Sequence, residues 1–109
     1  MDDSAPVIEI FRADAPPGLM PHGEIIEAAY LKGNMGGLVV IKLRTGELAK
    51  HRHEQEHVGA VLEGEFEFVS GDAVTVLRAG DLYRIPPHIP HGVRCRDYAL
   101  IVQARAEPC

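Results

Sequence analysis

The sequence predicts an all-β domain that folds as a sandwich or a barrel. Eleven glycines and eight prolines are spread along the chain and divide it into short apolar runs, as expected of strands separated by turns. In one run, residues 65–68, glutamate alternates with phenylalanine. This pattern is typical of a strand with one solvated and one buried face. Many short strands with frequent turns indicate one of these two architectures.

In the first half of the chain, apolar runs bounded by turn residues predict four strands. The run at 24–31 also has helical spacing in Ile25, Ile26 and Ala29. It is shorter than three helical turns and has no strong cap, so we interpret it as a strand. Residues 32–34 then form a predicted turn. The expected strands are 7–11, 24–31, 38–43 and 48–53.

The second half continues the same pattern with shorter runs. Glycine beside acidic or small residues predicts turns at 63–64, 70–72 and 79–81. The three prolines of 86–90 lack backbone N–H donors, so this segment cannot form a central strand. The expected strands are 58–62, 65–69, 73–77, 82–85, 93–95 and 98–103.

Length, charge and cysteine content limit the class of protein. A chain of 109 residues predicts one domain over 1–109, with its strands within about 7–105. The net charge of −5 argues against a nucleic-acid partner, which would need a basic surface. Cys95 and Cys109 are too few for a disulfide framework.

The chain shows no sequence signal for a membrane. No stretch reaches the ~20 apolar residues of a spanning helix. The first residues are acidic, and no apolar segment with a cleavage site follows them. We therefore expect no membrane partner, no secretory signal and a cytoplasmic location.

Histidines form the main functional pattern. Five of the six lie between positions 51 and 91. His51, His53 and His57 are separated by even numbers of residues, so on an extended chain they point to one face. Neutral imidazole is the commonest ligand for Zn, Cu, Fe and Ni. A fourth ligand must come from a distant strand, and His91 is the candidate.

Other interpretations of the histidines are open at this point. A surface strand can carry histidines that are merely solvated. Three same-facing imidazoles favour a shared ligand, because each would otherwise need its own partner in the interior. If the chain bends differently, Glu54 or Glu56 would replace His57 as a ligand.

Two segments resemble the motifs of the cupin superfamily, G-x5-H-x-H-x3,4-E-x6-G and G-x5-P-x-G-x2-H-x3-N. The first is similar to His51-x-His53-x3-His57-x6-Gly64, and the second to Gly80-x5-Pro86-x-His88-x2-His91. The motif region spans about 46–95. The resemblance implies a double-stranded β-helix, which is a small jelly-roll barrel with a metal at one mouth. It also implies a homodimer.

The sequence departs from these motifs in four places. Gly46 stands one residue closer to the first histidine, and His57 occupies the glutamate position. His88 replaces the glycine of the second motif, and Cys95 replaces its asparagine. The resemblance therefore implies a metal bound by four histidines: His51, His53, His57 and His91.

The implied function is that of a metal-dependent enzyme. Four neutral ligands leave the charge of a divalent ion (Mn, Fe, Ni, Zn, Co or Cu) uncompensated, which favours a small anionic substrate with keto, enol or carboxylate oxygens. The expected reaction is an isomerisation or a lyase step. The alternatives are a dioxygenase or oxidase, and a binding protein for a small ligand without catalysis. Residues 53–68 and 85–93 look closest to the cupins of pectin and alginate breakdown, which linearise unsaturated uronates.

Four further residues are candidates near such a site. Tyr83 could donate a hydrogen bond, although a strand tyrosine is more often simply packed. His88 could act as a general acid or base. Arg105 could hold a carboxylate with two hydrogen bonds. Cys95 is either a small buried hydrophobe or a pocket thiol, and we favour the first.

Overall fold

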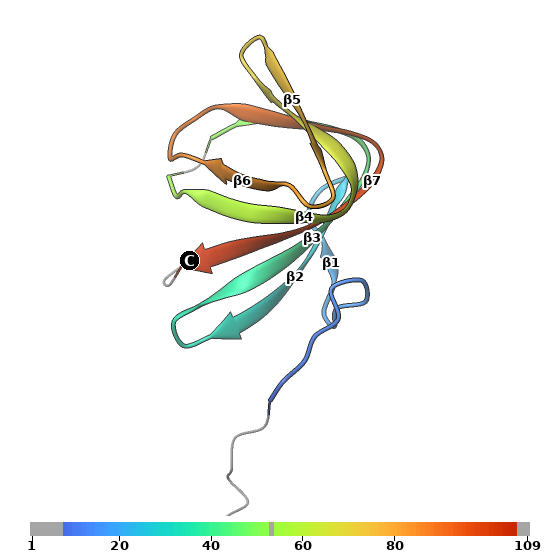
Figure 1. The fold of residues 1–109 in the computed structure, drawn as a ribbon, viewed down its shortest axis with the longest axis vertical. Coiled ribbons are helices and arrows are strands. Elements are labelled where there is room, and N and C mark those ends of the chain that lie inside the picture. Colours follow the sequence, from blue (N-terminus) through green and yellow to red (C-terminus); the bar gives the residue numbers. More distant parts are fainter. Residues whose placement is uncertain (1–7, 53, 107–109) are drawn as a thin grey trace, which may run out of the picture.

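The computed structural model describes residues 8–52 and 54–106, and all its regular elements are strands. Seven strands form one sheet in the order β1-β2-β3-β7-β4-β5, with β6 also paired to β4. Figure 1 shows β4, β6 and β7 curving around a common interior. No helix in the described ranges is long and apolar enough to cross a membrane. The strands are β1 (Met20–Pro21), β2 (Ile26–Gly33), β3 (Gly36–His51), β4 (His57–Ser70), β5 (Ala73–Arg78), β6 (Leu82–Ile85) and β7 (His91–Ala106).

Two neighbouring long strands, β3 and β7, each replace a pair of shorter predicted strands. β3 and β7 each have 16 residues and are paired antiparallel from Gly36 opposite Ala106 to His51 opposite His91. The predicted break near position 46 is instead an irregularity within β3, where Gly46 has a φ of +145°. An extra residue in one strand bends the strand without ending it.

β4 is likewise one continuous strand where the sequence predicts two. Its pairing with β7 shifts register between Val61 and Glu63 and again between Gly64 and Glu67. Gly64 has a φ of +77°, which a glycine adopts without steric cost. The glycine therefore bends β4 around the interior and does not end it.

The predicted strand at 7–11 is wrong for its described part, 8–11, which forms no regular element. Ile8 is 86% exposed and Ile10 67% exposed, and Figure 1 shows this segment leaving the sheet. An apolar alternation specifies a strand only where a neighbouring strand pairs with it. The predictions for β2, β5, β6 and the proline-rich loop are confirmed within one or two residues.

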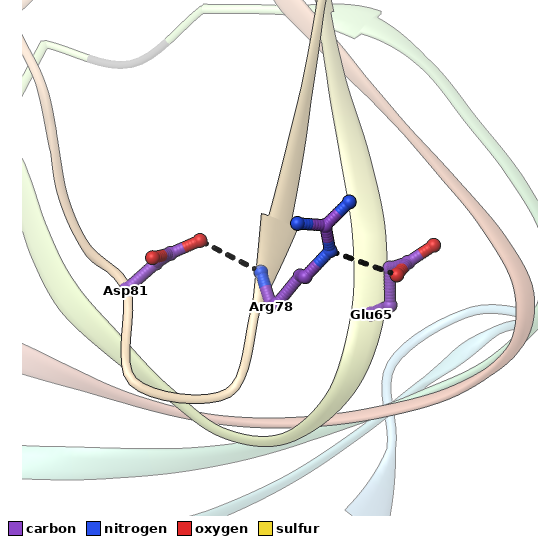
Figure 2. Close-up of polar contacts among 3 residues, drawn as sticks. All are labelled: Glu65, Arg78 and Asp81. Atoms are coloured by element: carbon purple, nitrogen blue, oxygen red, sulfur yellow. Dashed lines mark hydrogen bonds and ion pairs between the residues drawn. The ribbon is translucent and has the colours of Figure 1, made fainter.

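The turn between β5 and β6 is fixed by Arg78 and Asp81 (Figure 2). The backbone N–H of Arg78 donates to Oδ2 of Asp81 at 2.9 Å, and Nε of Arg78 lies 3.4 Å from Oε1 of Glu65 on β4. The backbone N–H of Val61 donates to the carbonyl of Asp81 at 2.9 Å. These bonds hold the start of β6 against β4.

The core lies between the curved strands. Phe66 on β4 is only 1% exposed, and its ring meets that of Phe68 edge-on at a centroid distance of 4.9 Å. The predicted burial of the phenylalanine face is therefore confirmed. The buried residues of this core cluster are Leu43, Val61, Phe66, Leu77, Val93, Cys95, Ala99 and Ile101.

Cys95 belongs to this core and not to a reactive site. Its Sγ lies 3.8 Å from the carbonyl oxygen of Glu65. Burial raises the pKa of the thiol, which keeps it neutral and unreactive. The interpretation as a small buried hydrophobe is confirmed.

We expect Gly64→Ala to destabilise the protein by about 3 kcal/mol or more, the range of severe backbone clashes. A Cβ at this position would collide with the carbonyl oxygen of Tyr98 on β7. Gly71→Ala is the matched control, because Gly71 also has a positive φ, +60°, but has open space around it. The control should cost about 1 kcal/mol. Urea unfolding of both variants measures the difference, and equal losses would contradict the role of Gly64 in bending β4.

Candidate functional site

A cavity of about 310 Å³ lies inside the curved sheet. Its lining residues recur at every second position along the strands, because alternate side chains face the interior. The strands that contribute are β2, β3, β4, β6 and β7. The described lining residues are His22, Ile26, Ala28, Tyr30, Val39, Ile41, Leu43, Leu48, His51, His57, Phe66, Phe68, Tyr83, Ile85, His91, Val93, Ile101 and Gln103.

Two of the predicted histidines form a pair in this cavity. His51 at the end of β3 lies opposite His91 at the start of β7. Their ring centroids are 4.5 Å apart with an interplanar angle of 56°, and His91 is only 5% exposed. Residues 40 positions apart in the sequence are therefore brought together by the pairing of two strands.

Both imidazoles are oriented by backbone carbonyls in the same way. Nδ1 of His51 lies 2.9 Å from the carbonyl oxygen of Ala49, and Nδ1 of His91 lies 2.9 Å from that of Ile89. A carbonyl oxygen only accepts hydrogen bonds, so each Nδ1 carries the proton. In the neutral ring this places the lone pair on Nε2, which is the arrangement found in histidines that bind metals.

The remaining predicted ligands are placed only in part. His57 begins β4 and lines the same cavity, whereas His53 lies outside the described residues. Within 8–52 and 54–106, no three His, Cys, Asp or Glu side chains form a group that could hold a metal ion. The set of four histidines therefore stays a prediction.

The donor chemistry of the described histidines fits a divalent transition metal. The rings of His51 and His91 lie next to each other, and both carry the proton on Nδ1 and the lone pair on Nε2. Nitrogen donors of this kind suit Zn, Cu, Fe and Ni. Backbone carbonyls also fix the orientation of ligating histidines in known metal sites. His51 and His91 would hold the ion, and His57 lines the same cavity.

A second polar feature of the cavity spans three strands. Gly59 on β4 is paired with Tyr83 on β6 and with Gln103 on β7. The hydroxyl of Tyr83 crosses Gly59 and donates to Oε1 of Gln103 at 2.5 Å. A Cβ on Gly59 would lie 2.5 Å from the Tyr83 hydroxyl oxygen. The missing side chain of Gly59 therefore makes this hydrogen bond possible.

Phe68 connects the histidine pair with this hydrogen bond. Its ring meets that of His91 edge-on at 6.0 Å and that of Tyr83 at 5.2 Å, measured between ring centroids. Burial raises the pKa of Tyr83 well above its usual value. Tyr83 therefore stays protonated at neutral pH and acts as a hydrogen-bond donor.

The three predicted catalytic candidates are separated by the structure. Tyr83 lines the cavity. His88 is exposed in the proline-rich loop with a φ of +66°, and it is not among the described lining residues. Arg105 is paired with Gly37 near the end of β7, and its side chain lies outside the described part.

Gln103 is a site residue that the sequence argument did not identify as functional. It is 7% exposed and its side chain faces the cavity. Its position on the closing strand was visible in the alternation pattern, but an isolated glutamine carries no motif. His22 is a second such residue, and its ring meets that of Tyr30 edge-on at 6.2 Å beside the same cavity.

Comparison with known proteins identifies the family. The family model of the cupin domain matches residues 37–102. This range includes the paired histidines and the whole motif region. The chain belongs to the cupin family. No curated protein matches this cupin significantly.

Solved structures confirm the predicted double-stranded β-helix of this cupin. An RmlC-like cupin from Shewanella frigidimarina is 28% identical with a TM-score of 0.70, covering 83% of this chain and 85% of its own. A protein with a double-stranded β-helix domain from Klebsiella pneumoniae is 26% identical with a TM-score of 0.71, covering 92% and 90%. KdgF from Halomonas sp. shares the fold at 21% identity and a TM-score of 0.70, covering 84% and 88%.

We expect Tyr83→Phe to lower the free energy of unfolding by about 1–2 kcal/mol, because it removes the donor to the buried amide oxygen of Gln103. Tyr98→Phe is the matched control. Its hydroxyl donates to Glu63 at 3.3 Å in an exposed setting, so its loss should cost less than about 0.5 kcal/mol. Urea unfolding measures both values. A Tyr83→Phe variant as stable as the control would show that the hydrogen bond across Gly59 contributes nothing.

Proposed function

We propose that this cupin is a metal-dependent enzyme that acts on a small oxygenated molecule inside the cavity. The metal is a divalent transition ion bound by His51, His53, His57 and His91. The observation that carries the proposal is the pair of adjacent imidazoles whose Nδ1 atoms are both oriented by backbone carbonyls. Histidines that bind metals usually donate their second ring N–H to such an acceptor, so this arrangement supports metal binding.

The proposed ligand set determines which substrates are favoured. Four imidazoles are neutral, so the charge of a divalent ion would remain uncompensated by its ligands. Such an ion supplies Lewis acidity that stabilises negative charge on a keto, enol or carboxylate oxygen. This chemistry supports an isomerase or lyase type of reaction on a small acid or ketone. The similarity of the motif region to cupins of pectin and alginate breakdown supports the same class.

The chain's own residues contribute orientation and exclusion of water. Apolar side chains from β3, β4 and β7, such as Ile41, Phe68 and Val93, line the cavity. They lower the local dielectric constant and strengthen polar contacts made within it. Tyr83 donates a hydrogen bond to the side-chain oxygen of Gln103 and so fixes the amide. In this scheme Tyr83 is a positioning residue, because its hydroxyl acts through Gln103.

The first test is metal analysis of the purified protein beside the double variant His51→Ala, His91→Ala. We expect about one transition-metal ion per chain in the wild type and loss of that ion in the variant. His88→Asn is the control, because asparagine tolerates the positive φ of this exposed loop residue. The control should keep its metal.

The identity of the metal separates the proposed function from its alternatives. Zinc would exclude the dioxygenase and oxidase, since zinc has no redox chemistry. Iron, manganese, nickel or copper together with oxygen uptake on diketones would favour the oxidative enzyme. A metal-free protein, or one whose metal survives the double substitution, would contradict the proposal and leave a small-ligand-binding protein.

Metal binding should also stabilise the fold. A ligand that binds only the native state at about 100 times its Kd raises the free energy of unfolding by about 2.7 kcal/mol. We expect this gain when the metal found by analysis is restored to metal-free wild type, and no gain for His91→Ala. Urea unfolding with and without the metal measures it. An equal gain in the variant would place the ion elsewhere on the protein.

A further inference from the structure

The cavity contains a buried hydrogen-bond donor that no residue within 8–52 and 54–106 satisfies. Gln103 is 7% exposed and lines the cavity. Its Oε1 accepts the hydroxyl proton of Tyr83 at 2.5 Å. Among the residues that the structure describes, no acceptor is paired with its Nε2. Buried polar groups almost always have a partner, so this amide nitrogen is a donor available to an acceptor atom that enters the cavity.

The hydrogen bond from Tyr83 fixes the orientation of the Gln103 side-chain amide. A side-chain amide offers an acceptor oxygen and a donor nitrogen, and it can turn over to exchange them. The hydroxyl of Tyr83 is held over Gly59 by the pairing of β6 with β4, and it occupies the oxygen. The oxygen already accepts this proton, so the two N–H groups of the nitrogen are the part of the amide that has no partner among the described residues. The pair therefore selects a ligand oxygen that accepts hydrogen bonds.

The other residues that line the cavity disfavour ligands with many polar groups. Most described lining residues are aliphatic or aromatic, and none of them is Asp, Glu, Lys or Arg. A sugar acid carries a hydroxyl on almost every carbon, and each buried hydroxyl without a partner costs free energy. A hydrocarbon group loses no hydrogen bonds when it enters the cavity, and the burial of its apolar surface is favourable.

From these observations we infer that the substrate is a carbonyl compound with an apolar body, such as an aryl or alkyl ketone, whose oxygen accepts from Nε2 of Gln103. This inference rests on the proposed function of the site and names its substrate class. Gln103 is the specificity-determining residue, and Tyr83 positions it. The inference therefore departs from the uronates of the cupins that the motif region resembles, because the aliphatic part of the wall offers no partners for their many hydroxyl groups.

The test uses the full-length protein with its metal removed by chelation, so that it is independent of the metal. Acetophenone and ethylbenzene serve as probes, because both are a benzene ring with a two-carbon substituent of similar size and only acetophenone has a carbonyl oxygen. Glucuronate serves as the polyhydroxylated competitor. NMR titration reports binding through the side-chain amide of Gln103 and the methyl groups of Ile101 and Ile41, which line the cavity.

The wild type should bind acetophenone about fivefold more tightly than ethylbenzene, as one neutral hydrogen bond predicts. Acetophenone should shift the amide signals of Gln103, and glucuronate should leave them unchanged. Ethylbenzene binding as tightly as acetophenone, glucuronate binding in the cavity, or no binding of either aryl probe would each overturn the inference.

Two variants test the roles of the residues. Gln103→Glu replaces the donor by an acceptor, so the preference for acetophenone should fall to about one or below while ethylbenzene binds as before. Tyr83→Phe frees the amide to turn over, so the preference should weaken there as well. A loss of affinity equal for both probes would indicate a merely structural role and overturn the assignment. The wild-type comparison decides the substrate class even where a variant fails to fold.

The two proposals can fail separately. A protein that takes up no metal but prefers acetophenone would contradict the metal-dependent function alone. A protein that holds its metal on the histidines but binds glucuronate in the cavity would contradict the substrate class alone.

Discussion

The antiparallel pairing of β3 with β7 is the constraint on which the rest of the structure depends. It runs from Gly36 opposite Ala106 to His51 opposite His91 and joins the two halves of the motif region. The same strand β7 pairs with β4 on its other edge. Because β7 is central, it carries residues from both polar parts of the cavity, His91 at its start and Gln103 near its end.

The irregularities in the long strands bend the paired strands around the cavity. A flat strand of 16 residues would extend well beyond a small core. Gly46 and Gly64 adopt positive φ values within β3 and β4, and the ladders shift register beside them. The strands therefore curve, and side chains on their concave face converge. Alternation along each strand then supplies both the apolar wall and the few polar groups.

The two polar features of the cavity, the histidine pair and the amide of Gln103, are held in place in different ways. His51 and His91 are fixed by carbonyls two residues earlier in their own chain segments, so their orientation is local. The amide of Gln103 is fixed by Tyr83 from another strand, across Gly59 on a third. The second arrangement depends on the register of three strands and is correspondingly sensitive to the turn held by Asp81.

Much of the fold and one half of the site could be predicted from the sequence. The even spacing of the histidines predicted that His51 faces the interior. The resemblance to the two motifs predicted that His51 and His91 belong to one site. The continuity of β3 and β4 could not be predicted, because glycine and its polar neighbours indicate a turn and a bulge equally well. The segment 8–11 has a strand pattern but no neighbour to pair with. Gln103 was missed because its role depends on Tyr83 and Gly59, which are distant in sequence.

The central claim is that the two carbonyl-oriented imidazoles bind a metal through Nε2. A nitrogen–proton NMR correlation spectrum of the histidine rings, recorded on protein loaded with cadmium, tests it most directly. The account predicts that His51 and His91 are protonated on Nδ1 and show coupling between cadmium and Nε2. Coupling to Nδ1, or histidine rings that do not respond to the metal, would contradict it.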